Sequence, residues 1–132
     1  MGNRASGAFE VTAFEPEETD EQPGSAVGRV RITKEFTGGL TGASVVRMLS
    51  VLDGAGGPAA YVAVERFTGA LDGRQGSFVL QHAAPGSHGE RLAIRVVEGT
   101  GSGELAGITG VFALDVDGEG RHTYVLDYAL NR

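Results

Sequence analysis

Apolar and polar residues alternate with a period of two along most of this 132-residue chain, and glycine separates the alternating runs. Such alternation places every second side chain on one face of a β-strand. Eight runs rich in Val, Phe and Tyr follow this pattern: residues 8–14, 29–36, 43–51, 61–67, 76–82, 91–97, 110–116 and 122–130. A helix is an alternative only near residues 43–52, and no window combines a 3.6-residue period with capping residues. We therefore expect one all-β domain over residues 1–132, an antiparallel barrel or sandwich of about eight strands.

A short repeat supports this organisation. Residues 37–42, 68–73 and 102–107 share the pattern [Thr/Ser]-Gly-x-Leu-x-Gly. Its glycines permit backbone conformations that a Cβ would resist, and its leucine is expected to cover the core at a turn. A phosphate-binding loop is not indicated, because neither a lysine nor a predicted helix follows the glycines.

The segment from residue 15 to residue 24 departs from the alternation. It holds two prolines and five carboxylates, a composition that cannot bury one face of a strand. We predict an exposed acidic loop at about residues 15–27. An acidic lid is the functional alternative to a solvated connection between two strands, and the solvated connection is the expectation.

Composition excludes several classes of function. The chain has no cysteine, which removes disulfides, thiolate nucleophiles and cysteine-ligated metals. Its formal net charge of -6 argues against nucleic-acid binding, and no apolar run is long enough to span a membrane. The first residues lack the apolar core of a signal peptide, so we expect a cytoplasmic protein. Three scattered histidines, His82, His88 and His122, show no metal-ligand spacing, and we expect neither a metal nor a cofactor.

The hairpin predicted over residues 61–82 is the most informative segment. Asp72-Gly73 between two β-like runs is a strong signal for a two-residue turn. The pairing that follows is Phe67 with Phe78, Glu65 with Leu80, and Ala63 with His82. This face carries two phenylalanines and a leucine, so we assign it to the interior. Glu65 and His82 then become diagonal cross-strand neighbours, which lie roughly 7–8 Å apart.

A carboxylate and an imidazole in an apolar interior can act as proton donor and acceptor without a metal. Glu65 and His82 are therefore the candidate catalytic residues. The alternative is a satisfied polar pair that only fixes strand register, and a one-residue bulge would separate the two side chains. The candidate ligand-binding residues are Tyr61, Phe67, Phe78, Leu80 and Tyr128.

Three runs of the chain match a known pattern: residues 64–82, residues 99–110 and the ending Tyr124-Val125-Leu126-Asp127-Tyr128. They resemble a bacterial family of small single-domain proteins of unknown function, and the resemblance covers nearly the whole chain. It implies a single antiparallel β-barrel of the allene-oxide-cyclase-like type. It does not imply the allene oxide cyclase reaction, because one fold supports many functions.

An eight-stranded barrel is either filled by side chains or encloses one small ligand. The first hypothesis is a barrel that binds a small hydrophobic molecule, with Glu65 and His82 serving a cofactor-free cyclase or isomerase. The alternatives are a non-catalytic carrier and a structural or oligomeric protein with a filled barrel. Self-association stays open, because small barrels often pair through exposed apolar strand faces. The sequence does not identify the ligand.

Overall fold

The computed structural model describes residues 2–85 and 92–131. His88 and the start of the strand expected at residue 91 lie outside these ranges. The strands are β1 (Asn3–Gln22), β2 (Ser25–Gly38), β3 (Leu40–Asp53), β4 (Pro58–Leu71), β5 (Arg74–Ala84), β6 (Ala93–Val96), β7 (Ser102–Gly103), β8 (Ile108–Val116) and β9 (His122–Leu130). Neither described range contains a helix long and apolar enough to cross a membrane.

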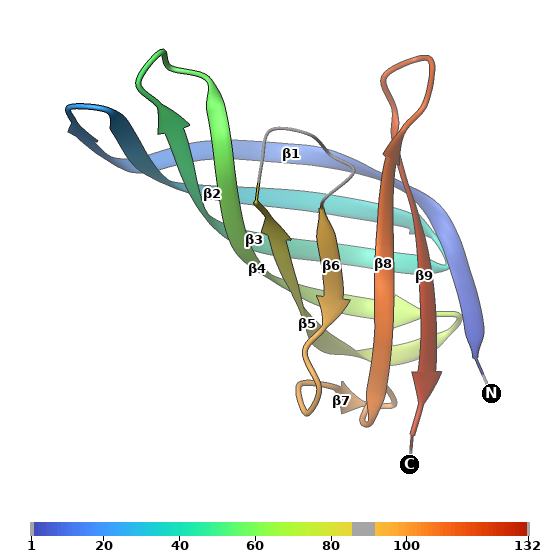
Figure 1. The fold of residues 1–132 in the computed structure, drawn as a ribbon. Coiled ribbons are helices and arrows are strands. Elements are labelled where there is room, and N and C mark those ends of the chain that lie inside the picture. The colour runs from blue at the N-terminus through green and yellow to red at the C-terminus, as the bar shows by residue number, and fades with distance from the viewer. Residues whose placement is uncertain (1, 86–91, 132) are drawn as a thin grey trace.

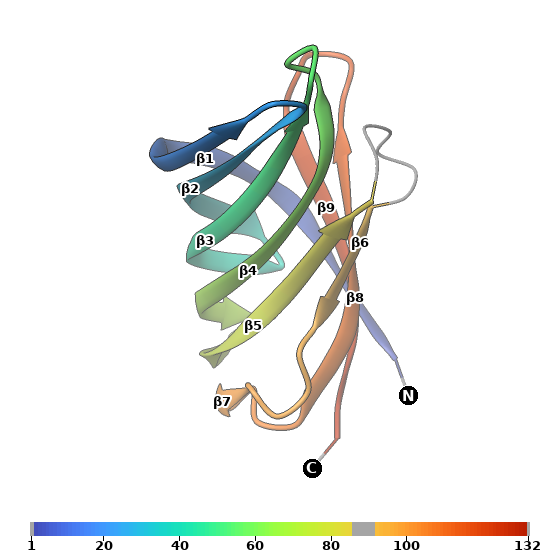
Figure 2. The ribbon, with the colours of Figure 1, turned by 60° about the vertical axis from the view of Figure 1, so that its left-hand side comes forward.

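All strands belong to one antiparallel sheet with the order β4-β3-β2-β1-β9-β8-β6-β5-β7. An additional pairing between β4 and β5 closes eight of them into a ring, and β7 pairs only with β5. The first and last strands meet, since β1 pairs with β9 from Asn3 opposite Tyr128 to Phe9 opposite His122. Figures 1 and 2 show the ring from two sides. The all-β expectation of about eight strands is confirmed, and residues 43–51 lie in a strand.

The β4–β5 hairpin has the predicted register. Asp72 and Gly73 have φ angles of 48° and 85°, as a two-residue hairpin turn with a left-handed backbone requires. The three repeats also lie at turns or just beside them, and their leucines, Leu40, Leu71 and Leu105, are completely buried. We call this end of the ring the leucine end. Here aromatic and aliphatic side chains from β1, β2, β4, β5, β6, β8 and β9 fill the interior.

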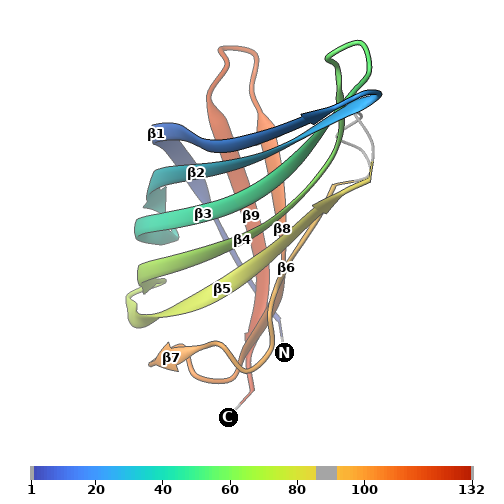
Figure 3. The ribbon, with the colours of Figure 1, turned by 90° about the vertical axis from the view of Figure 1, so that its left-hand side faces the viewer.

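The opposite end carries the β1–β2, β3–β4 and β8–β9 hairpins, whose tips extend beyond the ring (Figure 3). The acidic segment lies here, and the predicted loop is wrong. β1 continues to Gln22 and pairs with β2 up to Ser25, leaving only a turn at Pro23-Gly24. The segment is exposed, as expected. It is still a strand because hydrogen bonding to β2 does not require a buried face, and a register shift between Pro16 and Glu18 accommodates its irregularity. We call residues 15–31 the acidic arm and this end of the ring the arm end.

Candidate functional site

Among the residues that the structure describes, four polar side chains are buried inside the ring. They come from four neighbouring strands: Lys34 from β2, Ser44 from β3, Glu65 from β4 and His82 from β5. Their exposed fractions are 7%, 2%, 0% and 4%, respectively. Lys34 lies directly opposite Ser44 across β2 and β3. We call these four residues the polar network.

Glu65 is the centre of the network. Its Oε1 atom lies 2.7 Å from His82 Nε2 and 3.3 Å from Lys34 Nζ, and its Oε2 atom accepts a 2.5 Å hydrogen bond from Ser44 Oγ. Lys34 Nζ also lies 4.5 Å from the centre of the Phe9 ring. The contact between Glu65 and His82 that the hairpin register predicted is therefore present. Their catalytic role stays a prediction.

The environment of Glu65 determines its charge. Burial alone raises the pKa of this carboxyl group. The hydrogen bond from His82, the positive charge of Lys34 and the hydrogen bond from Ser44 together outweigh burial, and the pKa lies below its ordinary value. Glu65 is therefore ionised at neutral pH, and an ionised carboxylate only accepts hydrogen bonds. His82 Nε2 must then carry the proton of their shared bond, which leaves Nδ1 of a neutral imidazole as an acceptor.

Apolar side chains adjoin the network on the inner face of the arm end. Val11 lies opposite Lys34 and Phe14 lies opposite Ile32, and directly opposed residues share one face of a sheet. A register shift between Val11 and Ala13 keeps both side chains on this face. Phe14 is 59% exposed, an unusual state for an aromatic side chain on an inner face. The network therefore lies between a packed core and a solvent-exposed apolar surface.

Tyr61 is a predicted ligand-binding residue whose ring lies beside the network. It is half-buried, and the centre of its ring lies 6.4 Å from that of His82. Its hydroxyl has no hydrogen-bond partner among the described residues. Burial and the negative charge of Glu65 raise the pKa of Tyr61, so its hydroxyl stays protonated and can donate a hydrogen bond.

The other predicted ligand-binding residues are packed in the core or lie at the leucine end, although Leu80 is directly opposite Glu65 across β4 and β5. Phe67, Phe78 and Leu80 are almost completely buried in the core, where the two phenylalanine rings are 5.3 Å apart. Tyr128 belongs to the leucine end, where its hydroxyl donates a 2.5 Å hydrogen bond to Asp72. Burial and this bond raise the pKa of Tyr128 to about 12. The structure does not bring these four side chains together with the Tyr61 hydroxyl, and their ligand-binding role stays a prediction.

Sequence reasoning did not identify Lys34 and Ser44. A signal was present for Lys34, because it alternates with Val30, Ile32 and Phe36 and therefore lies on the same face of its strand. A lysine within such a run is a candidate for an inner position. Glu65 could not be named as its partner from the sequence. That contact depends on the registers of β2, β3 and β4 together, whereas a short turn signal defines the register of one hairpin.

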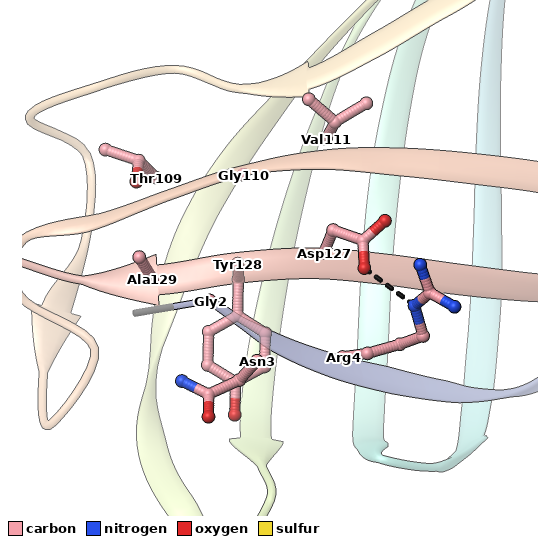
Figure 4. A pocket seen from close by; sticks show the side chains of 9 residues that line it. All are labelled: Gly2, Asn3, Arg4, Thr109, Gly110, Val111, Asp127, Tyr128 and Ala129. Carbon is pink, nitrogen blue, oxygen red and sulfur yellow. Dashed lines mark hydrogen bonds and ion pairs between the residues drawn. The ribbon is translucent and has the colours of Figure 1, made fainter.

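A depression lies on the outer surface of β1, β8 and β9 and has a volume of about 490 Å³. Figure 4 shows its lining, where Arg4 and Asp127 face each other and form a 2.8 Å ion pair. Both side chains are largely exposed, so this depression lacks the buried charged groups of the network. Within residues 2–85 and 92–131, His, Asp and Glu side chains nowhere form a group of three that could hold a metal ion.

Comparisons with known proteins agree with the resemblance found in the sequence. A family model described as a protein of unknown function, DUF3224, matches residues 5–128. A crystal structure of a protein with unknown function from the DUF3224 family of Shewanella oneidensis MR-1 has a TM-score of 0.88 and 36% sequence identity. The match covers 100% of this chain and 99% of that chain. A search of curated proteins finds no match. This chain belongs to the DUF3224 family.

Proposed function

We propose that the chain binds a small, mainly apolar molecule at the arm end. His82 removes a proton from this molecule and returns it, as the base of a cofactor-free isomerase or cyclase does. The observation that carries this proposal is the polar network, an ionised Glu65 hydrogen-bonded to His82 beside an exposed apolar surface. A carboxylate that fixes the tautomer of a histidine is a common arrangement for general acid–base chemistry.

A contribution to the stability of the fold does not by itself explain why such a network is present. Buried ion pairs often contribute no more to folding than apolar side chains of the same volume, because both charges lose their hydration. Glu65 and Lys34 nevertheless form an ion pair in an interior that, apart from the polar network, is built from aliphatic and aromatic residues over the described ranges. Perturbed titratable groups that cluster beside an apolar surface are typical of functional sites.

Each residue has a distinct role in this proposal. His82 Nδ1 accepts the proton, and Glu65 positions the imidazole and stabilises the charge that it gains. Lys34 and Ser44 keep Glu65 ionised. Tyr61 donates a hydrogen bond to an oxygen of the ligand, and Phe14 and Val11 contact its apolar part. Catalysis by positioning of this kind needs no conspicuous sequence motif.

A reaction that requires only a base in an apolar site tests the proton transfer. We expect the protein to open the ring of 5-nitrobenzisoxazole about 100-fold or more faster than buffer, measured by absorbance of the phenolate product. His82→Asn and Glu65→Gln should bring the rate close to that of buffer. His122→Asn is the matched control, because His122 stacks on Phe9 and forms no hydrogen bond or ion pair with the four network residues, and it should keep the rate. Circular dichroism verifies that each variant is folded. A wild-type rate no faster than buffer, or an unchanged rate in His82→Asn, would contradict the proposal.

A non-catalytic carrier is the second candidate. It is favoured by the absence of unsatisfied buried side-chain N or O atoms among the described residues, since a network in this state is stable without turnover. Fluorescence of 1-anilinonaphthalene-8-sulfonate separates the two functions. Binding that Phe14→Ser weakens, in a protein without activity on 5-nitrobenzisoxazole, would identify a carrier.

A further inference from the structure

The outer face of the ring carries an aliphatic patch on β3 and β4. Leu49, Val62 and Val64 are 48%, 54% and 52% exposed, and Leu49 lies directly opposite Val62. The outward side of a strand usually carries polar residues, because it faces water. Contiguous exposed aliphatic side chains on such a face are typical of an interaction surface.

Unneutralised arginines border this patch. Arg47 lies opposite Val64, Arg66 occupies the next outward position along β4, and Arg95 lies opposite Gln81, the β5 partner of Val64. None of these three arginines forms an ion pair within the part of the chain that the structure describes. Three cations on one face are notable in a chain whose formal net charge is -6. We call Leu49, Val62, Val64, Arg47, Arg66 and Arg95 the arginine face.

The acidic arm carries the opposite charge. It holds five carboxylates and two arginines, and Arg29 and Arg31 pair with Glu17, Glu18 and Glu15. Asp20 and Glu21, near its tip, have no cationic partner among the described residues. The arm projects beyond the ring (Figure 1), so its tip can contact a second molecule.

We propose that the arginine face binds a second copy of this chain, with the acidic arm of each copy against the arginines of the other. Leu49, Val62 and Val64 then lose contact with water against the partner. A two-fold dimer uses the same surface on both subunits, so that surface must carry both charges, as the arm and the arginine face do together. A nucleic acid fits less well, because its phosphates would meet the carboxylates of the neighbouring arm.

Sedimentation velocity over a range of protein concentrations tests this interface. We expect wild-type protein to form a dimer that weakens as sodium chloride screens the charges. Arg66→Glu/Arg95→Glu should raise the dimer dissociation constant by about tenfold or more, and so should Asp20→Arg/Glu21→Arg. An equimolar mixture of these two variants should dimerise again, because in the mixed dimer both contacts join opposite charges. Val62→Ser should weaken the dimer without changing its dependence on salt.

Arg4→Glu/Arg74→Glu is the matched control, since it makes the same change in net charge at exposed positions outside the arginine face. It should leave the dissociation constant unchanged. Wild-type protein that stays monomeric at every concentration would overturn the proposal. A dimer that survives both charge reversals, or variants that fail to dimerise when mixed, would overturn it too. Binding of monomeric wild-type protein to anionic phospholipid vesicles would assign the arginine face to a membrane surface instead.

Discussion

Lys34 balances the charge of the polar network. Its ammonium group lies 3.3 Å from the Glu65 carboxylate and 4.5 Å from the centre of the Phe9 ring, over its face. Glu65 has no exposure to water that could replace this partner. An isolated buried charge is far more costly than a buried pair. The lysine and the glutamate therefore form one unit, and neither is expected to tolerate loss of the other.

Lys34→Met tests this dependence. We expect it to reduce the free energy of unfolding by about 3–5 kcal/mol, because Glu65 is left without its cation. Lys34→Met/Glu65→Leu should lose less than the sum of the two single variants, because an apolar pair replaces both charges, although Ser44 and His82 lose their acceptor. Urea denaturation of the two single variants and the double variant gives the coupling energy. Arg4→Met, which breaks an exposed ion pair, should have little effect on unfolding. Additive effects of the Lys34 and Glu65 substitutions would contradict the interpretation.

The lowered pKa of Glu65 predicts a dependence of stability on pH. Its ordinary value is 4.5 and the folded-state value is lower, so the unfolded chain takes up the proton first as the pH falls. The stabilisation from this group is complete above about pH 4.5 and disappears as the pH falls through the folded-state pKa. The difference in unfolding free energy between wild type and Glu65→Gln should therefore shrink between pH 6 and pH 3, measured with urea at about ten pH values. A constant difference would show that Glu65 has no lowered pKa.

Among the strands and hairpins, sequence signals within one hairpin predicted more of the structure than signals that link strands of different hairpins. Asp72-Gly73 defined the turn, and the β4–β5 register followed from it, including the contact between Glu65 and His82. Lys34 and Ser44 reach the same carboxylate from β2 and β3, and their positions depend on pairings between separate hairpins. Composition led to the wrong prediction of a loop in the acidic arm, because composition indicates whether side chains are buried and does not indicate whether the backbone pairs with another strand.

Gly69 is required by the close approach of β3 and β4. A Cβ at this position would lie 2.2 Å from the carbonyl oxygen of Thr41, and its φ is 155°. Gly24 is the matched control: its φ is 94°, but nothing lies within 4 Å of a Cβ there. We expect Gly24→Ala to cost about 1 kcal/mol through its backbone angle, and Gly69→Ala to cost clearly more because strands must also separate. Thermal unfolding of both variants measures the difference. Equal costs would show that the strands move apart easily.

In the whole molecule, the two ends of the ring differ in how tightly their side chains are packed and in how much apolar surface they expose. The leucine end is closed by the buried leucines of its turns and by hydrogen bonds such as the one that the Leu40 backbone N–H donates to the Tyr124 hydroxyl. The arm end keeps apolar side chains exposed beside the polar network. Stability and the proposed chemistry are thus separated along the axis of the ring. Substitutions at the leucine end should act on folding, and substitutions at the arm end should act on binding.

Because the first and last strands pair with each other, the chain can be circularly permuted. Asn3 lies opposite Tyr128, so a short Gly/Ser linker can join residue 131 to residue 2. New ends at Gly24, in an exposed turn with open space around it, break no buried contact. We expect this permutant to fold as the wild type does and to match the wild type in the proposed activity on 5-nitrobenzisoxazole.

A permutant opened between Gly38 and Gly39 is the control. Gly39 donates a hydrogen bond to the carbonyl oxygen of Ser6, and a Cβ on either glycine would clash with β1. New ends here must disturb the leucine end, so this permutant should unfold at lower urea concentration than the permutant opened at Gly24. Equal midpoints for the two permutants would mean that the leucine end does not hold the ring together. Because both proteins share one linker and one composition, the comparison isolates the place at which the ring is cut.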